Sequence, residues 1–213
     1  MARRILIVTA VQAEADVIGQ PTGTFVVAGG IGRTNASAAT TETILSEGPF
    51  RGVINAGVAG SLPGSGLSIG DTVIANKCVY VEEGLMTPDG FQTMKQMGFP
   101  LGDFDGNEVP VNSLMLERLS TIGNVAPIAT VATCSGTDEQ ATLVATRTNC
   151  ICEAMEGAAV VHAARRVGAP AIEIRTISNT TGNRHSQEWD IELALSNLGK
   201  TVNEAITRLW DSK

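Results

Sequence analysis

The chain has 213 residues, of which 43% are hydrophobic and 17% are charged. These proportions are typical of a globular protein with a buried core, and they exclude an intrinsically disordered chain. The formal net charge of −7 argues against a nucleic-acid groove, because such a groove needs a basic patch to contact phosphates.

Apolar runs alternate with breaker residues along the chain and predict alternating strands and helices. Residues 4–9 form a continuous apolar run with β-branched side chains, which is typical of a buried strand. The final helix is the clearest, because apolar residues recur at steps of three and four from Ile191 to Leu209. Further strands are expected at 24–28, 52–57, 71–81, 126–132 and 171–177, and helices at 33–47, 114–119, 154–167 and 191–209.

This alternation predicts parallel crossovers and a doubly wound α/β sandwich. No repeat or linker divides the sequence, so residues 1–213 are expected to form a single domain. Arg3 and Arg4 precede an apolar stretch too short for a signal peptide or a membrane span, so a cytoplasmic protein without membrane contact is expected. The four cysteines lack the spacing of a disulfide framework or a zinc site and are interpreted as reduced, structural thiols.

Polar residues follow several of the predicted strands, where ligands bind in open α/β sheets. The candidates are Glu14, the segment 55–61, the pair Met155 and Glu156, and Asn179. The sequence has no G-x-S-x-G or H-E-x-x-H motif, so it gives no support for a serine hydrolase or a zinc protease.

The two histidines are not expected to be catalytic. His162 lies in the predicted helix 154–167 among small residues, which favours a position in the core or an interface. His185 lies in a predicted loop and is expected at the surface.

Six segments in order resemble the purine nucleoside phosphorylase/nucleosidase family: 10–14, 29–32, 54–61, 69–73, 154–159 and 175–179. A single glycine turn would be weak evidence, but six motifs in sequence across nearly the whole chain are specific. The resemblance implies a three-layer sandwich with a mixed central sheet flanked by helices. It also implies a homodimer or higher homo-oligomer that binds a nucleoside and needs neither a metal nor an organic cofactor.

The resemblance assigns roles that suit cleavage of a glycosidic bond, in which positive charge develops on the sugar and negative charge on the purine. Glu14 would act as general base on the attacking water, and Glu156 would accept hydrogen bonds from the ribose hydroxyls. Met155 would pack under the sugar, while Ala59 and Gly60 would line the base site together with the residue at 179. The structural alternative for both glutamates is a charge at a helix N-terminus.

Asn179 indicates which purine is bound. Adenine-specific nucleosidases of this family carry Asp at the corresponding position, which suits a 6-amino group. An amide NH₂ offers two donors and suits the N7 and O6 acceptors of a 6-oxopurine. Asn179 would therefore stabilise N7 by a hydrogen bond without delivering a proton, whereas its structural alternative is an Asx-turn.

Water is favoured over phosphate as the nucleophile. Phosphorylases that resemble this chain carry an arginine where Asn55 stands, and a phosphate site needs cations or backbone donors. Arg33 is the remaining candidate, with solvation at a helix start as its structural alternative.

Residues 177–184 followed by Trp189, and residues 83–85 with the turn at 88–91, resemble the subgroup that hydrolyses futalosine in menaquinone biosynthesis. Futalosine releases hypoxanthine and carries a benzoate, for which Arg184 is the candidate partner, with a solvated or ion-paired loop arginine as the alternative. Three other functions remain open: an inosine phosphorylase, an adenine-specific nucleosidase of methylthioadenosine or aminodeoxyfutalosine, and a non-catalytic nucleoside-binding protein.

Overall fold

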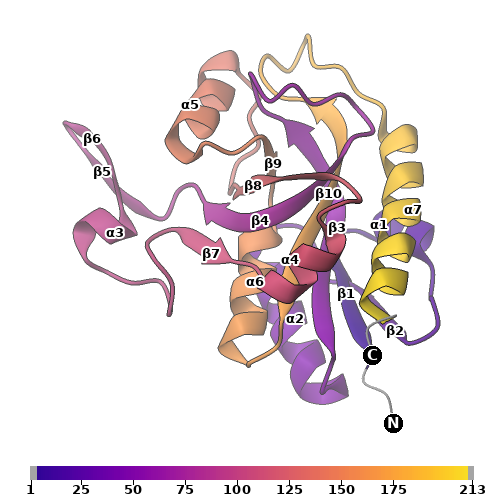
Figure 1. Cartoon of the computed structure of the whole chain (residues 1–213). Coiled ribbons are helices and arrows are strands. Elements are labelled where there is room, and N and C mark those ends of the chain that lie inside the picture. The colour runs from indigo at the N-terminus through magenta and orange to yellow at the C-terminus, as the bar shows by residue number, and fades with distance from the viewer. Residues whose placement is uncertain (1–3, 211–213) are drawn as a thin grey trace.

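A mixed eight-stranded β-sheet forms the centre of the structure, a computed structural model that describes residues 4–210 (Figure 1). Its strands are β1 (Ile5–Thr9), β2 (Thr24–Ala28), β3 (Gly52–Ser61), β4 (Thr72–Tyr80), β7 (Glu108–Pro110), β8 (Asn124–Thr130), β9 (Cys152–Ala154) and β10 (Ala171–Thr180). A separate hairpin, formed by β5 (Gly84–Thr87) and β6 (Gly90–Thr93), projects from the body of the molecule in Figure 1.

Helices cover both faces of the sheet. Their bounds are α1 (Gln12–Ile18), α2 (Arg33–Glu47), α3 (Met94–Met97), α4 (Ser113–Leu119), α5 (Asp138–Thr148), α6 (Gly157–Arg166) and α7 (Ile191–Trp210). Helices α1 and α4 pack beside α7, which buries Leu198, Val202 and Ile206 against the sheet. Helices α2 and α6 pack together, and the small residues of α6, such as Ala158 and Ala164, are fully buried in the other main core cluster. The expected three-layer sandwich is therefore confirmed.

Strand β3 changes its neighbour halfway along its length. One edge pairs with β10 in parallel from Val53 to Ser61. On the other edge, β1 pairs with the first residues as far as Asn55, and β9 pairs with Gly60 and Ser61. Among the described residues, no strand pairs with residues 56–59 on that edge, and the chain leaving β1 enters α1 there. Such a break in the strand order is where α/β folds place ligands.

Several predicted bounds agree with the structure, and the remainder differ because of sheet pairing. The strand 24–28 and the helix 33–47 have the predicted bounds. Strands β3 and β10 extend beyond the predicted ends at 57 and 177 because they pair with each other. The helix predicted at 154–167 begins only at Gly157, because residues 152–154 form β9.

The sheet is mixed rather than purely parallel. Strand β4 runs antiparallel to β10, and β9 runs antiparallel to β3. The mixed sheet implied by the family resemblance is therefore confirmed, and the expected parallel pairing holds for β1, β2, β3 and β10 and for β4, β8 and β9. The alternation of apolar runs also did not predict the short helix α1, helix α5 or the hairpin.

Candidate active site

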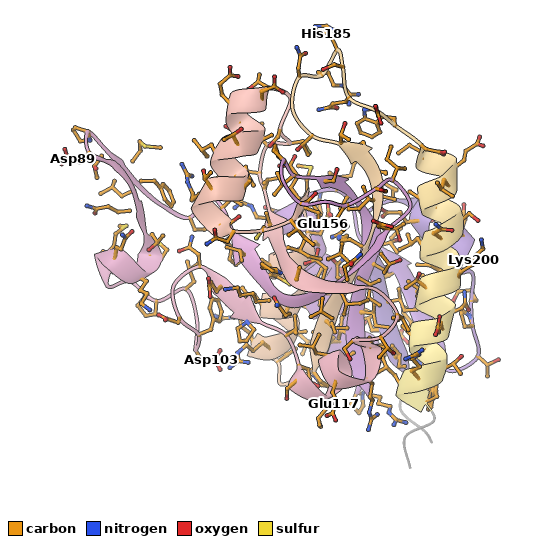
Figure 2. All side chains as sticks on the ribbon, turned by 45° about the horizontal axis from the view of Figure 1, so that its top comes forward. Asp89, Asp103, Glu117, Glu156, His185 and Lys200 are labelled. Atoms are coloured by element: carbon orange, nitrogen blue, oxygen red, sulfur yellow. The ribbon has the colours of Figure 1, made fainter. Side chains whose placement is uncertain are left out.

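A pocket of about 230 Å³ opens where β3 changes its neighbour. Its walls come from the segment after β1, the end of β3, the β9–α6 junction and the end of β10. It is lined by six residues singled out in the sequence: Glu14, Ala59, Gly60, Met155, Glu156 and Asn179. Figure 2 shows Glu156 in the middle of the molecule, whereas His185 lies at the tip of an outer loop.

Glu14 is buried in the first turn of α1, with 3% of its surface exposed. Its Oε2 accepts hydrogen bonds from the backbone N–H groups of Ala10 at 2.9 Å and Val11 at 3.3 Å. Its Oε1 accepts from the backbone N–H of Val58 at 2.9 Å, on the part of β3 that lacks a strand neighbour. The carboxylate thus caps α1 and fills the gap beside β3, and its orientation is set by three backbone groups.

Arg175 lies beneath the pocket and was not singled out as a site residue in the sequence. It is 1% exposed, and its Nη2 donates to Asn55 Oδ1 at 2.6 Å and to Glu156 Oε2 at 3.2 Å. Its Nε donates to Glu173 Oε1 at 2.8 Å. Burial lowers the pKa of Arg175, but the nearby carboxylates of Glu173, Glu156 and Glu14 raise it, and the balance leaves it above its ordinary value.

Gly57 brings Glu14 and Arg175 together. A Cβ added at this glycine would contact Arg175 Nη1 and would lie 2.7 Å from Glu14 Oε1. The guanidinium and the carboxylate therefore both rest against the bare backbone of residue 57. Any larger residue would displace one or both of these groups.

Glu156 precedes α6 as its N-cap residue and is 4% exposed. Its Oε1 accepts from the backbone N–H of Gly32 at 3.0 Å, and its Oε2 accepts from Arg175. Gly32 has a φ of +89°, which favours glycine at this position of the turn before α2. A carboxylate has about four lone-pair sites, so Glu156 can accept further hydrogen bonds from a sugar in the pocket.

Asn179 lies near the end of β10 with 8% of its surface exposed. Its Oδ1 accepts from Ser178 Oγ at 2.8 Å, and its Nδ2 donates to the carbonyl oxygen of Thr180 at 2.8 Å. The amide therefore has one N–H left for a ligand, because no described residue accepts its second hydrogen. That both amide hydrogens contact the base stays a prediction, which requires Asn179 to release the carbonyl oxygen of Thr180.

Arg184 does not line the pocket. It is exposed in the loop after β10, and its guanidinium lies 4.7 Å from the centre of the Trp189 ring. Trp189 does line the pocket, so Arg184 lies at the rim, one side chain away from the cavity.

Arg33 and the two histidines lie away from the pocket. Arg33 forms ion pairs with Glu82, at 3.4 Å, and with Glu83. His162 Nδ1 lies 3.4 Å from the hydroxyl oxygen of Tyr80, and burial lowers the pKa of the imidazole. His185 is exposed, as predicted.

The pocket also contains buried polar groups that the sequence motifs did not indicate. Glu153 is 4% exposed and accepts hydrogen bonds from the N–H of Ser135 at 2.7 Å and its hydroxyl at 2.6 Å. Burial raises the pKa of Glu153, and these bonds partly oppose that shift. Cys134, the residue before Ser135, is exposed and lines the pocket.

Among residues 4–210, no group of three or more His, Cys, Asp or Glu side chains could hold a metal ion. None of the helices described is both long and apolar enough to span a membrane.

The chain is similar to several known proteins along nearly its whole length. A family model described as the phosphorylase superfamily matches residues 20–210. The futalosine hydrolase of Acidothermus cellulolyticus is 34% identical, with 93% of this chain and 88% of that protein covered. The futalosine hydrolase of Streptomyces coelicolor is 28% identical over 94% of each chain.

Solved structures share the fold at low identity. The futalosine hydrolase of Helicobacter pylori superimposes with a TM-score of 0.80 at 18% identity, covering 97% of this chain and 98% of that chain. A 5′-methylthioadenosine/S-adenosylhomocysteine nucleosidase from Neisseria meningitidis superimposes with a TM-score of 0.79 at 18% identity, covering 97% and 99%. At this identity, the likeness shows the fold alone.

Proposed function

The chain belongs to the phosphorylase superfamily, and we propose that it is a nucleosidase that hydrolyses futalosine to hypoxanthine and dehypoxanthine futalosine. The two futalosine hydrolases that align with nearly its whole length support this substrate. The reaction belongs to a route of menaquinone biosynthesis.

The observation that carries the proposal is the meeting of Glu14, Glu156 and Asn179 in one pocket, with Arg175 beneath. These groups come from α1, the β9–α6 junction and β10. A nucleoside in this pocket would have carboxylates near its sugar and an amide donor near its base. This arrangement suits a transition state in which the sugar becomes positive and the purine negative.

In the proposed reaction, the bond between the anomeric carbon and the purine nitrogen breaks, and its electron pair leaves with the purine. A water oxygen forms the new bond to the anomeric carbon, and Glu14 takes the proton of that water. Glu156 accepts hydrogen bonds from the ribose hydroxyls, and Met155 packs under the sugar. The remaining N–H of Asn179 donates a hydrogen bond to the departing purine. An amide does not release this hydrogen as an acid, so the purine takes its proton from solvent.

Hydrolysis is favoured over phosphorolysis by the charges around the pocket. Arg175 is the one cationic side chain among the described residues that line it, and Glu173, Glu156 and Asn55 already occupy its guanidinium. Arg33, the other candidate for phosphate, forms ion pairs with two glutamates. A bound phosphate would therefore meet more carboxylates than free cations.

A product assay with matched substrates tests the proposal. Purified protein is incubated with futalosine, aminodeoxyfutalosine, inosine or methylthioadenosine, with and without phosphate, and the free bases and sugars are separated by chromatography. We expect hypoxanthine from futalosine at a rate that phosphate does not change. Release of ribose 1-phosphate from inosine, preferential release of adenine, or binding without turnover would each overturn it in favour of one of the alternatives.

Variants of two acids on α1 assign the general base. Glu14→Gln should lower kcat by about 10²- to 10⁴-fold, the usual contribution of a positioned base. Asp16→Asn is the matched control, because Asp16 lies on the same helix but is exposed. Equal rates in the two variants would remove Glu14 from the mechanism.

We also propose that the chain forms a homodimer or a higher homo-oligomer. The projecting hairpin and the segment after α3 expose Leu85, Met86 and Phe99, with 48%, 67% and 61% of their surfaces accessible. Large apolar side chains exposed on a projecting element favour contact with another protein surface. Light scattering coupled to size-exclusion chromatography measures the assembly, and a monomer at micromolar concentration would contradict it.

A further inference from the structure

One glutamine in the loop after β10 links the rim of the pocket to its wall. Gln187 Nε2 donates to the carbonyl oxygens of Ser135 at 3.0 Å and Gly182 at 2.9 Å. Its Oε1 accepts from Arg184 Nη1 at 2.9 Å and from Trp189 Nε1 at 3.2 Å. All four hydrogen-bonding positions of this planar amide are thus filled, which fixes its orientation.

The two side chains that Gln187 orients also contact each other. The Arg184 guanidinium lies over the Trp189 ring, and the ring lines the pocket. Stacking on the indole and bonding to Oε1 hold the planar guanidinium at the rim, with other N–H groups available for a ligand. An aromatic face and a cation side by side suit a ligand group that is itself aromatic and anionic.

The wall to which Gln187 is anchored is rigid. The Ser135 N–H and hydroxyl groups both donate to the buried carboxylate of Glu153, which lines the same pocket. The backbone N–H of Arg184 also donates to the carbonyl oxygen of Gly136 at 3.0 Å. The loop after β10 is therefore fastened to the segment after β8 at two places close to the pocket.

We propose that Gln187 is a positioning residue for substrate selection, which holds Arg184 and Trp189 to receive the benzoate of futalosine. This inference rests on the proposed function, since it assigns the recognition of the far end of the same substrate. Gln187 itself does not touch the reacting atoms. Gln187 affects the affinity for the benzoate and leaves the chemistry at the anomeric carbon unchanged.

The test compares futalosine with inosine, which has the same base but lacks the benzoate. KM and kcat are measured for futalosine, and inosine is measured as a competitive inhibitor whether or not it is cleaved. Gln187→Ala should raise KM for futalosine by about tenfold, as expected for loss of an ordered charge-assisted contact. Its kcat and the inhibition constant of inosine should stay within about twofold of wild type.

A double-mutant cycle shows whether Gln187 acts through its neighbour. Arg184→Ala should raise KM for futalosine at least as much as Gln187→Ala, and the double variant should add little to Arg184→Ala alone. His185→Ala is the matched control, because His185 lies in the same loop with its side chain at the exposed tip (Figure 2). It should leave both constants unchanged.

The outcomes separate this inference from the proposed function. If wild-type protein releases no hypoxanthine from futalosine, the proposed function fails and the inference falls with it. If wild type is active but Gln187→Ala leaves KM for futalosine unchanged, the inference alone is overturned. It is also overturned if affinity for futalosine and inosine falls equally, because Gln187 would then support the pocket as a whole.

Discussion

Replacing Gly57 by alanine tests whether the positions of Glu14 and Arg175 against this backbone set the rate. The added Cβ would lie 2.7 Å from Glu14 Oε1, whereas ordinary contacts of a Cβ begin at 3.4 Å. The carboxylate must therefore retreat by about 0.7 Å, or the strand must shift by a similar distance. A displacement of ~1 Å in a reacting group lowers a rate by about a hundredfold, so we expect kcat for futalosine to fall by about 10- to 100-fold.

The fold should survive this change. Overpacking at one buried site costs about 1–3 kcal/mol, which is less than the stability of a typical domain. Circular dichroism and urea unfolding check this, while release of hypoxanthine gives kcat. Gly52→Ala is the matched control on the same strand, because its Cβ would lie 3.2 Å from the flexible end of Met115 and at an ordinary contact distance of 3.6 Å from the carbonyl oxygen of Pro170. A Gly57→Ala protein that is folded and turns over at the wild-type rate would refute the reasoning.

Three other predictions concern the same pocket. Asn179→Asp would put a carboxyl oxygen where Nδ2 now donates to Thr180 at 2.8 Å, so the donor proposed for the 6-oxopurine is lost. We therefore expect kcat/KM for futalosine, divided by kcat/KM for aminodeoxyfutalosine, to fall by about 10- to 100-fold. An unchanged ratio would mean that this amide does not read the base. Burial raises the pKa of the Cys150 thiol to about 12, whereas Cys134 is exposed beside the pocket, although burial raises its pKa as well. An alkylating reagent should therefore modify Cys134 before Cys150, as followed by peptide mass spectrometry. Bound inosine should slow the modification of Cys134, and an unchanged rate would place the ligand elsewhere. Burial raises the pKa of Glu153 above its ordinary value of 4.5, so the folded chain holds this proton more tightly than the unfolded chain. The stabilisation from that proton is complete below pH 4.5 and is lost as the pH rises through the raised pKa. As the pH rises over this range, the urea midpoint of wild type should fall relative to that of Glu153→Gln. If the two midpoints change in parallel with pH, the raised pKa of Glu153 is contradicted.

The site residues that could be predicted from the sequence are those whose position follows from the neighbouring strand. Glu14 and Glu156 each follow a strand closely and Asn179 lies near the end of β10, and these strand ends meet around one pocket. Their neighbours along the chain were therefore enough to place them at the same edge of the sheet.

Arg175 was missed because its role depends on contacts between distant segments. Its partners Asn55 and Glu156 are 120 and 19 positions away, and no local pattern links them. One signal was present: Glu173 and Arg175 are charged residues two apart in an apolar strand, so they share a face of a buried sheet. Such an alternation predicts an internal ion pair.

The exposed loop was the least predictable part of the site. Arg184 was predicted to bind the carboxylate of the substrate, but it lies at the rim, where it donates a hydrogen bond to Gln187 and stacks on Trp189. These contacts depend on the conformation of residues 181–189, which no periodic pattern sets. The break in pairing along β3 follows from the tertiary arrangement and has no local pattern, whereas the hairpin is local and only its turn at 88–91 was predicted.

The ion pair of Glu173 and Arg175 has a consequence for how this protein can evolve. Removing one partner of a buried pair typically destabilises a protein by about 3–5 kcal/mol, whereas exchanging both for apolar residues can be neutral. Glu173 is fully buried, and Arg175 is the one cation that pairs with it among residues 4–210. A lineage that loses either charge alone must therefore pass through a poorly folding ancestor. Positions 173 and 175 should therefore co-vary among related sequences. A library that randomises both positions together should recover functional sequences that single substitutions never reach.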